Sequence, residues 1–359
     1  MFKKKRKVLL TGLTGFIGKH TARKIYQKFD ITAIVRPGTP KSAYSEFEAD
    51  VKIVKLNLSD RERLKVFLDT QTFDFILHIG ALRGGRQFDS TEFMRANVIA
   101  TEILIANAIK NNSKFIFCSS VGVYGTIPLE LPANLYTPYQ DDNLYHKTKI
   151  QCEQIIKKAI YEKKLIACIV RPSITYGTDD IGFPYTLTKL VDKKRLYLPK
   201  KPIFIHLLNV DTLSEVFKKL LDRGFTSGKI WNVADKKEVC LQQLADFIHN
   251  RLHEIRALKA KENMPVPEDL NTTPEPIETK AAFRPYPTKK LIDKSFFDFS
   301  VKMAKLFKDE LWTSRLELIS KSWYYDVNSI YEELNIETYN TIPDFGNVVD
   351  WYFDQEEAQ

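Results

Sequence analysis

A run of apolar residues that leads directly into three regularly spaced glycines constrains the fold of this chain most. Residues 8–10 are apolar, Gly12, Gly15 and Gly18 follow at intervals of three, and residues 21–26 continue with helical spacing. A turn this tight requires residues without a Cβ atom, and the helix after it presents free N–H groups to an anion. The third glycine lets helix and strand pack closely. The stretch therefore predicts a strand–turn–helix unit that binds a dinucleotide pyrophosphate; its flanking strand and helix argue against an ordinary glycine-rich turn.

The length and composition fit a globular protein with an ample core. The 359 residues allow one large or two modest domains, and 44% of them are hydrophobic and 28% charged. No apolar run approaches the ~20 residues that a membrane-spanning helix needs, which argues against a membrane protein. The four cysteines, at positions 118, 152, 168 and 240, lack the spacing of metal ligands. We therefore expect no metal site, and reduced, mostly buried thiols in a cytoplasmic protein.

The formal net charge is +9, and part of it comes from the basic run at residues 3–7. Such a run can be a nuclear localisation signal, a nucleic-acid patch or the start of a signal peptide. The glycines that follow interrupt the apolar region of a signal peptide, and no cleavage site is evident. We interpret the run as a solvated leader and expect no nucleic-acid partner. The remaining positive charge fits an anionic substrate or a phosphorylated cofactor.

Strands and helices are expected to alternate along the first half of the chain. Further β-rich stretches lie at residues 31–35, 51–56, 73–81 and 114–118, and helical patterns start near residue 61, after an N-cap at Asp60, and span 91–110. This alternation predicts a doubly wound parallel sheet with its site at the carboxyl ends of the strands. A small return strand is expected at residues 229–234.

An arginine follows the second expected strand, at the position that meets the adenosine ribose in dinucleotide folds. An acidic residue there selects NAD, whereas an arginine can bind the 2′-phosphate of NADP. This chain has Arg36, with Lys41 and Ser42 close behind. The alternative is an exposed loop arginine with no ligand. We therefore favour NADP over NAD as the cofactor.

Three residues near the end of the fifth expected strand suggest acid–base chemistry. Ser120 follows that strand, and Tyr145 and Lys149 lie four residues apart at the start of an expected helix, so they share one face. An ammonium near a phenol favours the phenolate, which can exchange a proton with an alcohol or ketone near neutral pH. A tyrosine and a lysine at this spacing are common by chance. Their place after the fifth strand of a sheet that begins with the glycine turn supports a functional role. We interpret His78, inside the fourth strand, as a buried and hydrogen-bonded residue rather than a catalytic one.

These motifs resemble those of the extended short-chain dehydrogenase/reductase family, in particular its epimerase/dehydratase branch. Residues 11–18 match the family's TGxxGxxG form, and residues 119–125 resemble the segment that carries its catalytic serine. Ser120 stands 145 − 120 = 25 residues before Tyr145, which fits extended members. Residues 171–177 resemble the segment beside the nicotinamide, and Trp351 and Tyr352 resemble a motif near the end of family members.

The resemblance implies a Rossmann-type fold in which Tyr145 is the general acid/base, Ser120 positions the substrate oxygen and Lys149 also binds the nicotinamide ribose. Family members often form dimers through the helices that correspond to those containing Asn97 and Tyr145. The resemblance therefore implies that this chain forms a homodimer in the same way. It also implies a site for NADP or NAD that comprises, besides Tyr145 and Lys149, Gly12, Gly15, Phe16, Ile17, Gly18, Arg36, Asn57, Leu58, Ile79, Gly80, Ala81, Asn97, Pro172 and Ser173.

Two departures from the family pattern bear on the substrate. Sugar-nucleotide epimerases have an arginine that binds the substrate pyrophosphate where this chain has Ile205 and His206, which argues against a UDP- or dTDP-sugar substrate. Lys200, Lys201 or Arg284 could substitute for that arginine, although a lysine lacks its bidentate geometry. The glutamate pair that dehydratases use beside the serine is replaced by Val121 and Gly122. Sugar-nucleotide dehydration is therefore disfavoured.

The expected function is an NAD(P)-dependent oxidoreductase or epimerase that acts on a secondary alcohol or ketone of a small molecule such as a sugar or sugar nucleotide. An NADPH ketoreductase of the dihydroflavonol or hydroxysteroid type and a non-catalytic NADP-binding protein remain alternatives. Residues 1–172 with a return segment at 203–235 are expected to form the dinucleotide-binding domain. Residues 173–202 and 236–359 are expected to form the substrate-binding part, with an irregular loop at 261–287 and an aromatic helical stripe at 291–312 that packs in a core or interface.

Overall fold

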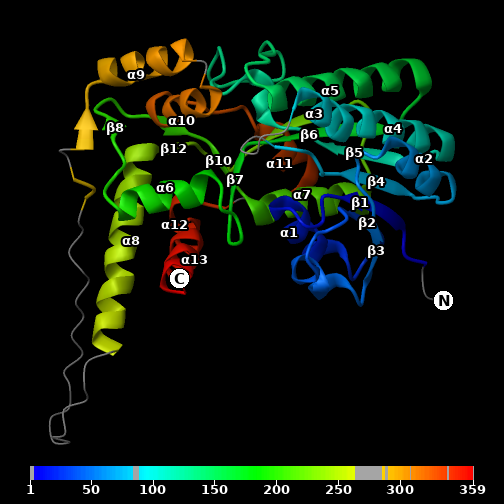
Figure 1. Cartoon of the computed structure of the whole chain (residues 1–359), viewed down its shortest axis with the longest axis horizontal. Coiled ribbons are helices and arrows are strands. Elements are labelled where there is room, and N and C mark those ends of the chain that lie inside the picture. The colour runs from blue at the N-terminus through cyan, green and yellow to red at the C-terminus, as the bar shows by residue number, and fades with distance from the viewer. Residues whose placement is uncertain are drawn as a thin grey trace, which may run out of the picture.

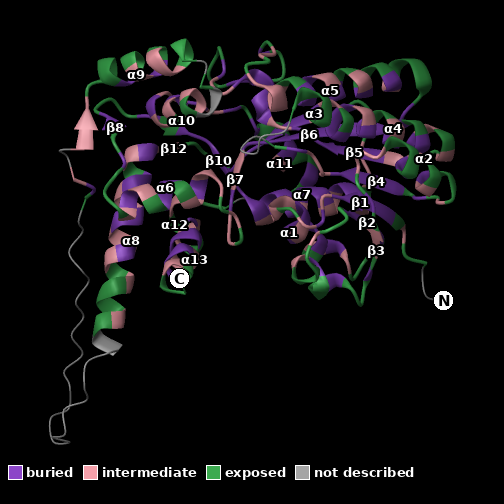
Figure 2. Ribbon diagram, in the orientation of Figure 1, coloured by how far each residue is buried: buried purple, intermediate pink, exposed green. Residues whose placement is uncertain are grey.

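The computed structural model describes residues 4–83, 89–262, 285–287, 290–307, 309–337 and 339–358. A seven-stranded parallel sheet forms one half of the molecule, and helices with short two-stranded sheets form the other (Figure 1). The strands of the large sheet are buried between layers of helices (Figure 2). Gly84 and Gly85, a pair of glycines typical of a loop, and most of the expected 261–287 loop lie outside the described residues.

The large sheet has the order β11-β6-β5-β4-β1-β2-β3. Val8 in β1 pairs with Ile31 in β2 on one side and with Phe75 in β4 on the other. The chain therefore reverses its direction of winding between β1 and β4, where ligands bind in open α/β sheets. The doubly wound sheet predicted from the sequence is confirmed. Its strands are β1 (Lys7–Thr11), β2 (Asp30–Val35), β3 (Val51–Lys55), β4 (Phe75–His78), β5 (Lys114–Cys118), β6 (Ala167–Pro172) and β11 (Ile230–Val233).

Helices cover both faces of this sheet. Helices α1 (Phe16–Ile25) and α7 (Val210–Arg223) pack side by side on one face and share an apolar core with α11 (Asn328–Leu334). Helices α2 (Arg61–Asp69), α4 (Ala100–Asn111) and α5 (Leu144–Lys163) cover the other face, over a second core (Figure 1). Asp60 caps α2 as expected, because its side chain accepts from the amide of Arg63.

The helix expected over residues 91–110 is interrupted. The chain forms α3 (Ser90–Phe93), then a π-helical turn over Met94–Ile99, then α4. Asn97 lies in the π turn, where its amide binds both backbone groups of Leu82. Such turns occur often at functional sites. Here the wider turn lets Asn97 reach the segment after β4, which no periodicity argument captures.

The other half of the molecule has its own apolar core. The stripe predicted as one helix over 291–312 instead divides between β13, α9 and α10. Phe297 is buried, but Phe296, Phe299 and Phe307 are exposed, so most of the stripe does not pack in the core of this chain, and its role in an interface stays a prediction. The elements are β7 (Ile174–Tyr176), α6 (Phe183–Asp192), β8 (Leu198–Pro199), β9 (Phe204–Ile205), β10 (Leu207–Asn209), β12 (Val239–Cys240), α8 (Leu241–Glu262), β13 (Leu291–Ile292), α9 (Lys294–Leu306), α10 (Glu310–Ser320), α12 (Thr341–Asp344) and α13 (Gly346–Glu357).

Candidate active site

The glycine turn between β1 and α1 is sterically closed to larger residues. Gly12 has φ +84°, and a Cβ atom on it would lie 2.7 Å from the backbone nitrogen of Gly80. A Cβ atom on Gly18 would lie only 1.9 Å from the carbonyl oxygen of Gly12. The first contact brings β4 against the turn, and the second brings α1 against β1. Both close approaches require glycine, as the sequence predicts.

The start of α1 fits a dinucleotide pyrophosphate. Its N-cap, Gly15, supplies no side-chain hydrogen bond to the first-turn amides. A Cβ atom there would meet only the Gly12 carbonyl oxygen, at 3.4 Å, so the space above the turn is open. Free N–H groups at a helix N-terminus bind anions. Phe16 and Ile17 begin this helix, and Phe16 packs edge-on against His20. These residues can therefore hold the cofactor that the sequence predicts.

The residues expected at the adenosine end lie at the ends of neighbouring strands. Arg36 is exposed directly after β2. Asn57 is exposed after β3, where its side-chain oxygen accepts from the amide of Ser59 at 3.2 Å. The Leu58 side chain lies 3.2 Å from the point where Gly80 would carry a Cβ atom. The structure thus brings Arg36, Asn57 and Leu58 to the same edge of the sheet as the glycine turn.

His78 holds the end of β4 in place. Its Nδ1 lies 2.7 Å from the Thr11 hydroxyl and its Nε2 lies 2.9 Å from the Thr101 hydroxyl. Burial, together with the charge of Lys149, lowers the pKa of His78 to about 3. His78 is therefore neutral and occupied by hydrogen bonds, which confirms the structural interpretation. The partly exposed segment that follows, Ile79, Gly80 and Ala81, lies beside the glycine turn.

The two serines after β5 face different environments. Ser119 is buried and its hydroxyl donates to Glu153 at 2.6 Å. The Ser120 hydroxyl instead accepts from the amide of Gly122 at 3.0 Å, at the start of the 3₁₀ turn Val121–Tyr124. Successive residues of an extended segment point in opposite directions. Ser120, and not Ser119, is therefore on the side of the expected catalytic group.

Tyr145 and Lys149 lie on one face of α5, as their spacing predicts. Lys149 is only 3% exposed, and its Nζ donates to the carbonyl oxygen of Cys118 at 2.6 Å. The same Nζ lies 5.8 Å from the centre of the Tyr145 ring. The buried ammonium is thus anchored to the end of β5 close to the phenol. A positive charge in this position stabilises the phenolate form of a tyrosine.

Asn97 and the segment after β6 form buried connections around this centre. The Asn97 amide donates to the carbonyl of Leu82 at 3.1 Å and to the hydroxyl of Thr148 at 3.0 Å, so it joins the segment after β4 to α5. Pro172 and Ser173 are also buried, and the Ser173 hydroxyl donates to the carbonyl of His206. In this structure, Asn97 and Ser173 hold segments around the site. Their contacts with a cofactor stay predictions.

Sequence reasoning missed a buried ion pair behind the catalytic face. Glu153 receives hydrogen bonds from Arg171 at 2.8 and 2.6 Å, and both side chains are almost fully buried. Burial opposes ionisation, but the hydrogen bonds and charge of Arg171 hold the pKa of Glu153 below its usual range. Tyr145, Lys149 and Glu153 are spaced by four, so an acidic residue on the buried face of α5 was the available signal.

A second missed residue is the cation Arg83, which follows β4 after four small or apolar residues. Burial raises the pKa of the Cys118 thiol to about 11, and the charges of Lys149 and Arg83 oppose the rise. Burial also raises the pKa of Asp180, and Arg83 again opposes the rise. Arg83 therefore lies within electrostatic reach of the end of β5 and of the segment after β7. It is an exposed positive charge beside the candidate site.

The residues in place of the family's phosphate-binding arginine are structural. Ile205 and His206 are buried, and His206 Nε2 lies 2.6 Å from the carbonyl oxygen of Asp235. Burial lowers the pKa of His206, which disfavours its charged form. Lys200 forms an exposed ion pair with Asp293 at 3.2 Å, and Arg284 lies outside the described residues. Ile205 and His206 therefore do not present a cation to a substrate.

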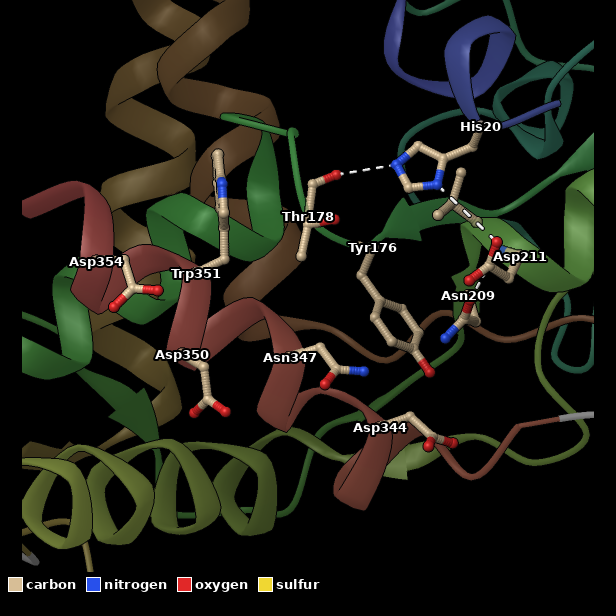
Figure 3. A pocket seen from close by; sticks show the side chains of 12 residues that line it. His20, Tyr176, Thr178, Asn209, Asp211, Asp344, Asn347, Asp350, Trp351 and Asp354 are labelled. Atoms are coloured by element: carbon tan, nitrogen blue, oxygen red, sulfur yellow. Dashed lines mark hydrogen bonds and ion pairs between the residues drawn. The ribbon is translucent and has the colours of Figure 1, made fainter. Parts of the chain in front are cut away.

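A separate pocket of about 320 Å³ lies between α1, the segment after β7 and the C-terminal helices (Figure 3). Its lining includes Asp211, Asp344, Asp350 and Asp354. Asp350 is paired with Arg251 at 2.8 Å, but the lining remains rich in carboxylates. Such a surface repels nucleotide phosphates. The pocket is therefore a poor site for the cofactor, and the glycine turn is the better one.

Three further observations on the described residues concern metal ligands, cysteines and membrane-spanning helices. No group of three or more His, Cys, Asp or Glu residues among them could hold a metal ion. All four cysteines are free thiols, and three of them are buried, as expected. Within the same described ranges, no helix combines the length and apolar character needed to cross a membrane.

Comparisons with known proteins agree with this geometry. The chain is 28% identical over 210 residues to UDP-glucose 4-epimerase GEPI48 from Cyamopsis tetragonoloba, an alignment that covers 52% of this chain and 59% of that protein. It thus spans less than two thirds of that relative's length. It is also 25% identical over 275 residues to the human dTDP-D-glucose 4,6-dehydratase, covering 72% of this chain and 77% of that enzyme.

Solved structures share the fold over the whole chain. The crystal structure of gox2253 superposes with a TM-score of 0.73 at 21% identity and covers 98% of both chains. The dTDP-glucose 4,6-dehydratase from Bacillus anthracis in complex with NAD superposes with a TM-score of 0.68 at 16% identity, again over 98% of both chains. The model of the NAD dependent epimerase/dehydratase family matches residues 8–198, more than half of the chain. The chain therefore belongs to the NAD dependent epimerase/dehydratase family.

Proposed function

We propose that this protein oxidises and re-reduces a secondary alcohol of a sugar nucleotide, as an epimerase does, with Tyr145 as the general acid/base. One observation carries the proposal. Lys149 is anchored to the Cys118 carbonyl at the end of β5, with its Nζ 5.8 Å from the centre of the Tyr145 ring, and Ser120 follows the same strand, at the edge of the sheet that carries the glycine turn. Family membership and the sugar-nucleotide relatives support this assignment.

The chain's own residues supply proton transfer and orientation. A bound nicotinamide supplies the acceptor for a hydride. Tyr145, whose ring lies beside the ammonium of Lys149, takes the proton of the substrate hydroxyl and later returns it. The Ser120 hydroxyl, positioned by the Gly122 amide, hydrogen-bonds to the same substrate oxygen. Buried Lys149 keeps its ammonium at this place because the Cys118 carbonyl accepts from it.

The proposed substrate is anionic because the site has an exposed cation at its edge. Arg83 lies near the end of β5, and its charge reaches Cys118 and Asp180. A guanidinium can bind a phosphate with two parallel hydrogen bonds. We propose that Arg83 provides part of the binding energy that the buried Ile205 and His206 cannot provide. An R83A variant should raise KM for a nucleotide sugar more than it lowers kcat.

The cofactor is proposed to be NADP or NAD, with Arg36 favouring NADP. Arg36 is exposed directly after β2, where a 2′-phosphate would lie. The family description names NAD. Mass spectrometry of the nucleotide released on denaturation of the freshly purified protein separates the two. Retained NAD would indicate a cofactor regenerated in place, as an epimerase requires, and would contradict the interpretation of Arg36.

An NADPH-dependent ketoreductase is the second candidate. It is favoured because the family's pyrophosphate-binding position holds Ile205 and His206 instead of an arginine, and both residues are buried. A panel of UDP- and dTDP-hexoses and aromatic or steroid ketones distinguishes the two functions. Conversion of a hexose without net consumption of cofactor supports the epimerase. Consumption of NADPH with a ketone, and none with any hexose, supports the reductase.

A further inference from the structure

The residue after the catalytic tyrosine, His146, belongs to a second polar group at the start of α5. Its Nδ1 lies 2.5 Å from a carboxylate oxygen of Asp142, four residues earlier. The other oxygen of that carboxylate accepts from the backbone amide of Thr126 at 2.7 Å. Burial opposes ionisation of Asp142, but the hydrogen bond and charge of His146 and the Thr126 amide lower its pKa. The pair is therefore an ionised carboxylate that fixes an imidazole.

This contact sets the tautomer of the ring. A carboxylate can only accept, so Nδ1 carries the hydrogen and, in the neutral ring, Nε2 carries the lone pair. Asn143 supports the pair in another way: its Nδ2 donates to the same oxygen of Asp142 at 3.2 Å, and its side-chain oxygen accepts from the His146 amide at 2.9 Å. That Nδ2 also lies 2.8 Å from Nδ1 of His146, but two N–H groups cannot hydrogen-bond to each other, so the shorter contact with Asp142 determines the tautomer. Nε2, on the other edge, has no hydrogen-bond partner within the described part of the chain.

The free edge of the ring lies against Gly122, near Ser120. It fills the space that Gly122 leaves by having no side chain. A Cβ atom on Gly122 would lie 2.4 Å from both Cδ2 and Nε2 of His146, and 3.2 Å from the Ser120 hydroxyl oxygen. The His146 ring is also 5.9 Å from the Tyr145 ring, centre to centre. Only 14% of the His146 side chain is exposed.

We propose that the Asp142–His146 pair is a second acid–base group of this active site, which exchanges a proton with a carbon next to the oxidised carbon of the substrate. The proposal rests on the proposed function, because hydride transfer must first create the carbonyl group. Tyr145 handles the hydroxyl proton, so this imidazole has no role in the hydride step. Its place beside Ser120 brings it to the atoms that flank the carbonyl.

The proposed step balances as an ordinary enolisation. The bond between the flanking carbon and its hydrogen breaks, the proton goes to Nε2 of His146, and the electron pair forms the enolate. The hydroxyls of Ser120 and Tyr145 hydrogen-bond to the enolate oxygen, while the carboxylate of Asp142 stabilises the imidazolium. Return of a proton to the carbon restores the ketone, on the same face or the opposite one. No further oxidant or reductant is required.

Deuterium exchange tests the proposal. The full-length protein, loaded with NAD, is incubated in D₂O with UDP-glucose or dTDP-glucose, and carbon-bound deuterium is measured by NMR while the absorbance of NADH is followed. Hydride transfer returns the original hydrogen to carbon, so deuterium on a flanking carbon reports on the second group alone. The wild-type protein should acquire it. H146N should lose at least ~100-fold of the exchange rate and keep NADH formation within about threefold.

Matched variants separate chemistry from structure. H253N removes a histidine on α8 and should leave exchange and NADH formation unchanged. D142N should reduce exchange through the orientation of the ring, whereas D141N, at the exposed neighbouring position, should not. G122A places a methyl group where the ring lies and should lower exchange without removing a titratable group. Thermal unfolding checks that each variant is folded.

The outcomes distinguish this proposal from the function it rests on. NADH formation without deuterium in the wild-type product overturns the second acid–base group and leaves the Tyr145 function standing. Equal exchange in H146N and the wild type also overturns it. If the wild type converts neither sugar nucleotide to an epimer and forms no reduced cofactor with either, the proposed function itself is wrong, and the role of His146 is wrong with it.

Discussion

The two ends of one face of α5 differ in how their polar groups are satisfied. At the inner end, Glu153 receives two hydrogen bonds from Arg171 and one from Ser119, and the pair is buried from solvent. At the outer end, the rings of Tyr145 and His146 lie 5.9 Å apart, and the free edge of His146 lies against Gly122, near Ser120. One helix thus carries a closed polar network and an open one within about three turns.

The difference indicates which polar groups hold the fold and which are available for chemistry. A buried charge whose partners are all within the protein has no capacity left for a ligand, and its removal leaves the partner unpaired. A polar atom held on one side and free on the other is ready to bind or exchange a proton. Lys149 stands between the two ends, since its ammonium is bound to Cys118 and still faces the phenol.

The largest effect is expected at the open end, on activity. Replacing Tyr145 by phenylalanine removes the acid/base hydroxyl, and turnover should fall by about 10²–10⁴-fold. Because the Tyr145 hydroxyl holds no part of the core, the free energy of unfolding should change by less than ~1 kcal/mol. Steady-state turnover and chemical denaturation measure the two quantities. Unchanged turnover in Y145F would remove the basis for the catalytic assignment.

At the closed end the expected effect is on stability. The E153Q variant leaves the guanidinium of Arg171 buried without its counter-charge, and the free energy of unfolding should fall by about 3–5 kcal/mol. Chemical denaturation measures the loss. The matched control is E162Q on the exposed end of α5, where Lys158 and Glu162 are 4.0 Å apart and the loss should stay below ~1 kcal/mol. Equal losses in the two variants would contradict the comparison.

Asp235 is a buried carboxyl group like Glu153, but its hydrogen-bond partners are neutral. It accepts from the Tyr176 hydroxyl and the Asn209 amide, and burial raises its pKa to about 6. Since the folded-state pKa exceeds the unfolded one, the stability that Asp235 contributes is present at about pH 4 and is lost as pH rises through about 6. Relative to D235N, wild-type stability should therefore fall by up to about 3 kcal/mol across this window. Denaturation curves of both proteins at several pH values measure the difference; parallel curves would show that the Asp235 pKa is not raised.

The smallest effect is expected at Arg36, an exposed cation at the sheet edge. R36A should weaken NADP binding about tenfold, which is ~1.4 kcal/mol, and leave NAD binding unchanged because NAD lacks the 2′-phosphate. Isothermal titration with each nucleotide measures both affinities. R315A, at an exposed arginine on α10, should change neither. Equal losses for the two nucleotides in R36A would exclude a role in selecting the cofactor.

Most of the sheet and the core of the site could be predicted from the sequence. Short-range signals determine them: the glycine spacing at Gly12 and Gly18, the β-branched runs of the strands and the four-residue interval between Tyr145 and Lys149. Such signals require no knowledge of distant contacts. The strand β5 begins and ends at the predicted residues. The strands β1, β2, β3, β4 and β11 differ from prediction mainly at their ends, and no range was predicted for β6.

What the sequence could not show depends on contacts between distant segments. The π turn at Asn97 forms where the helix meets Leu82, and periodicity within the helix cannot register that contact. The ion pair between Glu153 and Arg171 joins α5 to β6, and neither segment's own sequence indicates its partner. His146 is inconspicuous until the fold places its ring over Gly122. The exposure of Phe296 likewise follows from the direction of α9, which hydrophobicity alone does not determine.

The side-by-side packing of α1 (Phe16–Ile25) and α7 (Val210–Arg223) has a consequence during synthesis of the chain on the ribosome. Ribosomes add about 5–20 residues per second, so roughly 10 to 40 seconds separate the emergence of these two helices. During that interval the apolar side of α1 has no partner helix. A nascent chain of this protein is therefore exposed to aggregation until its residues near 223 are made, and chaperone binding during translation should be concentrated before that point.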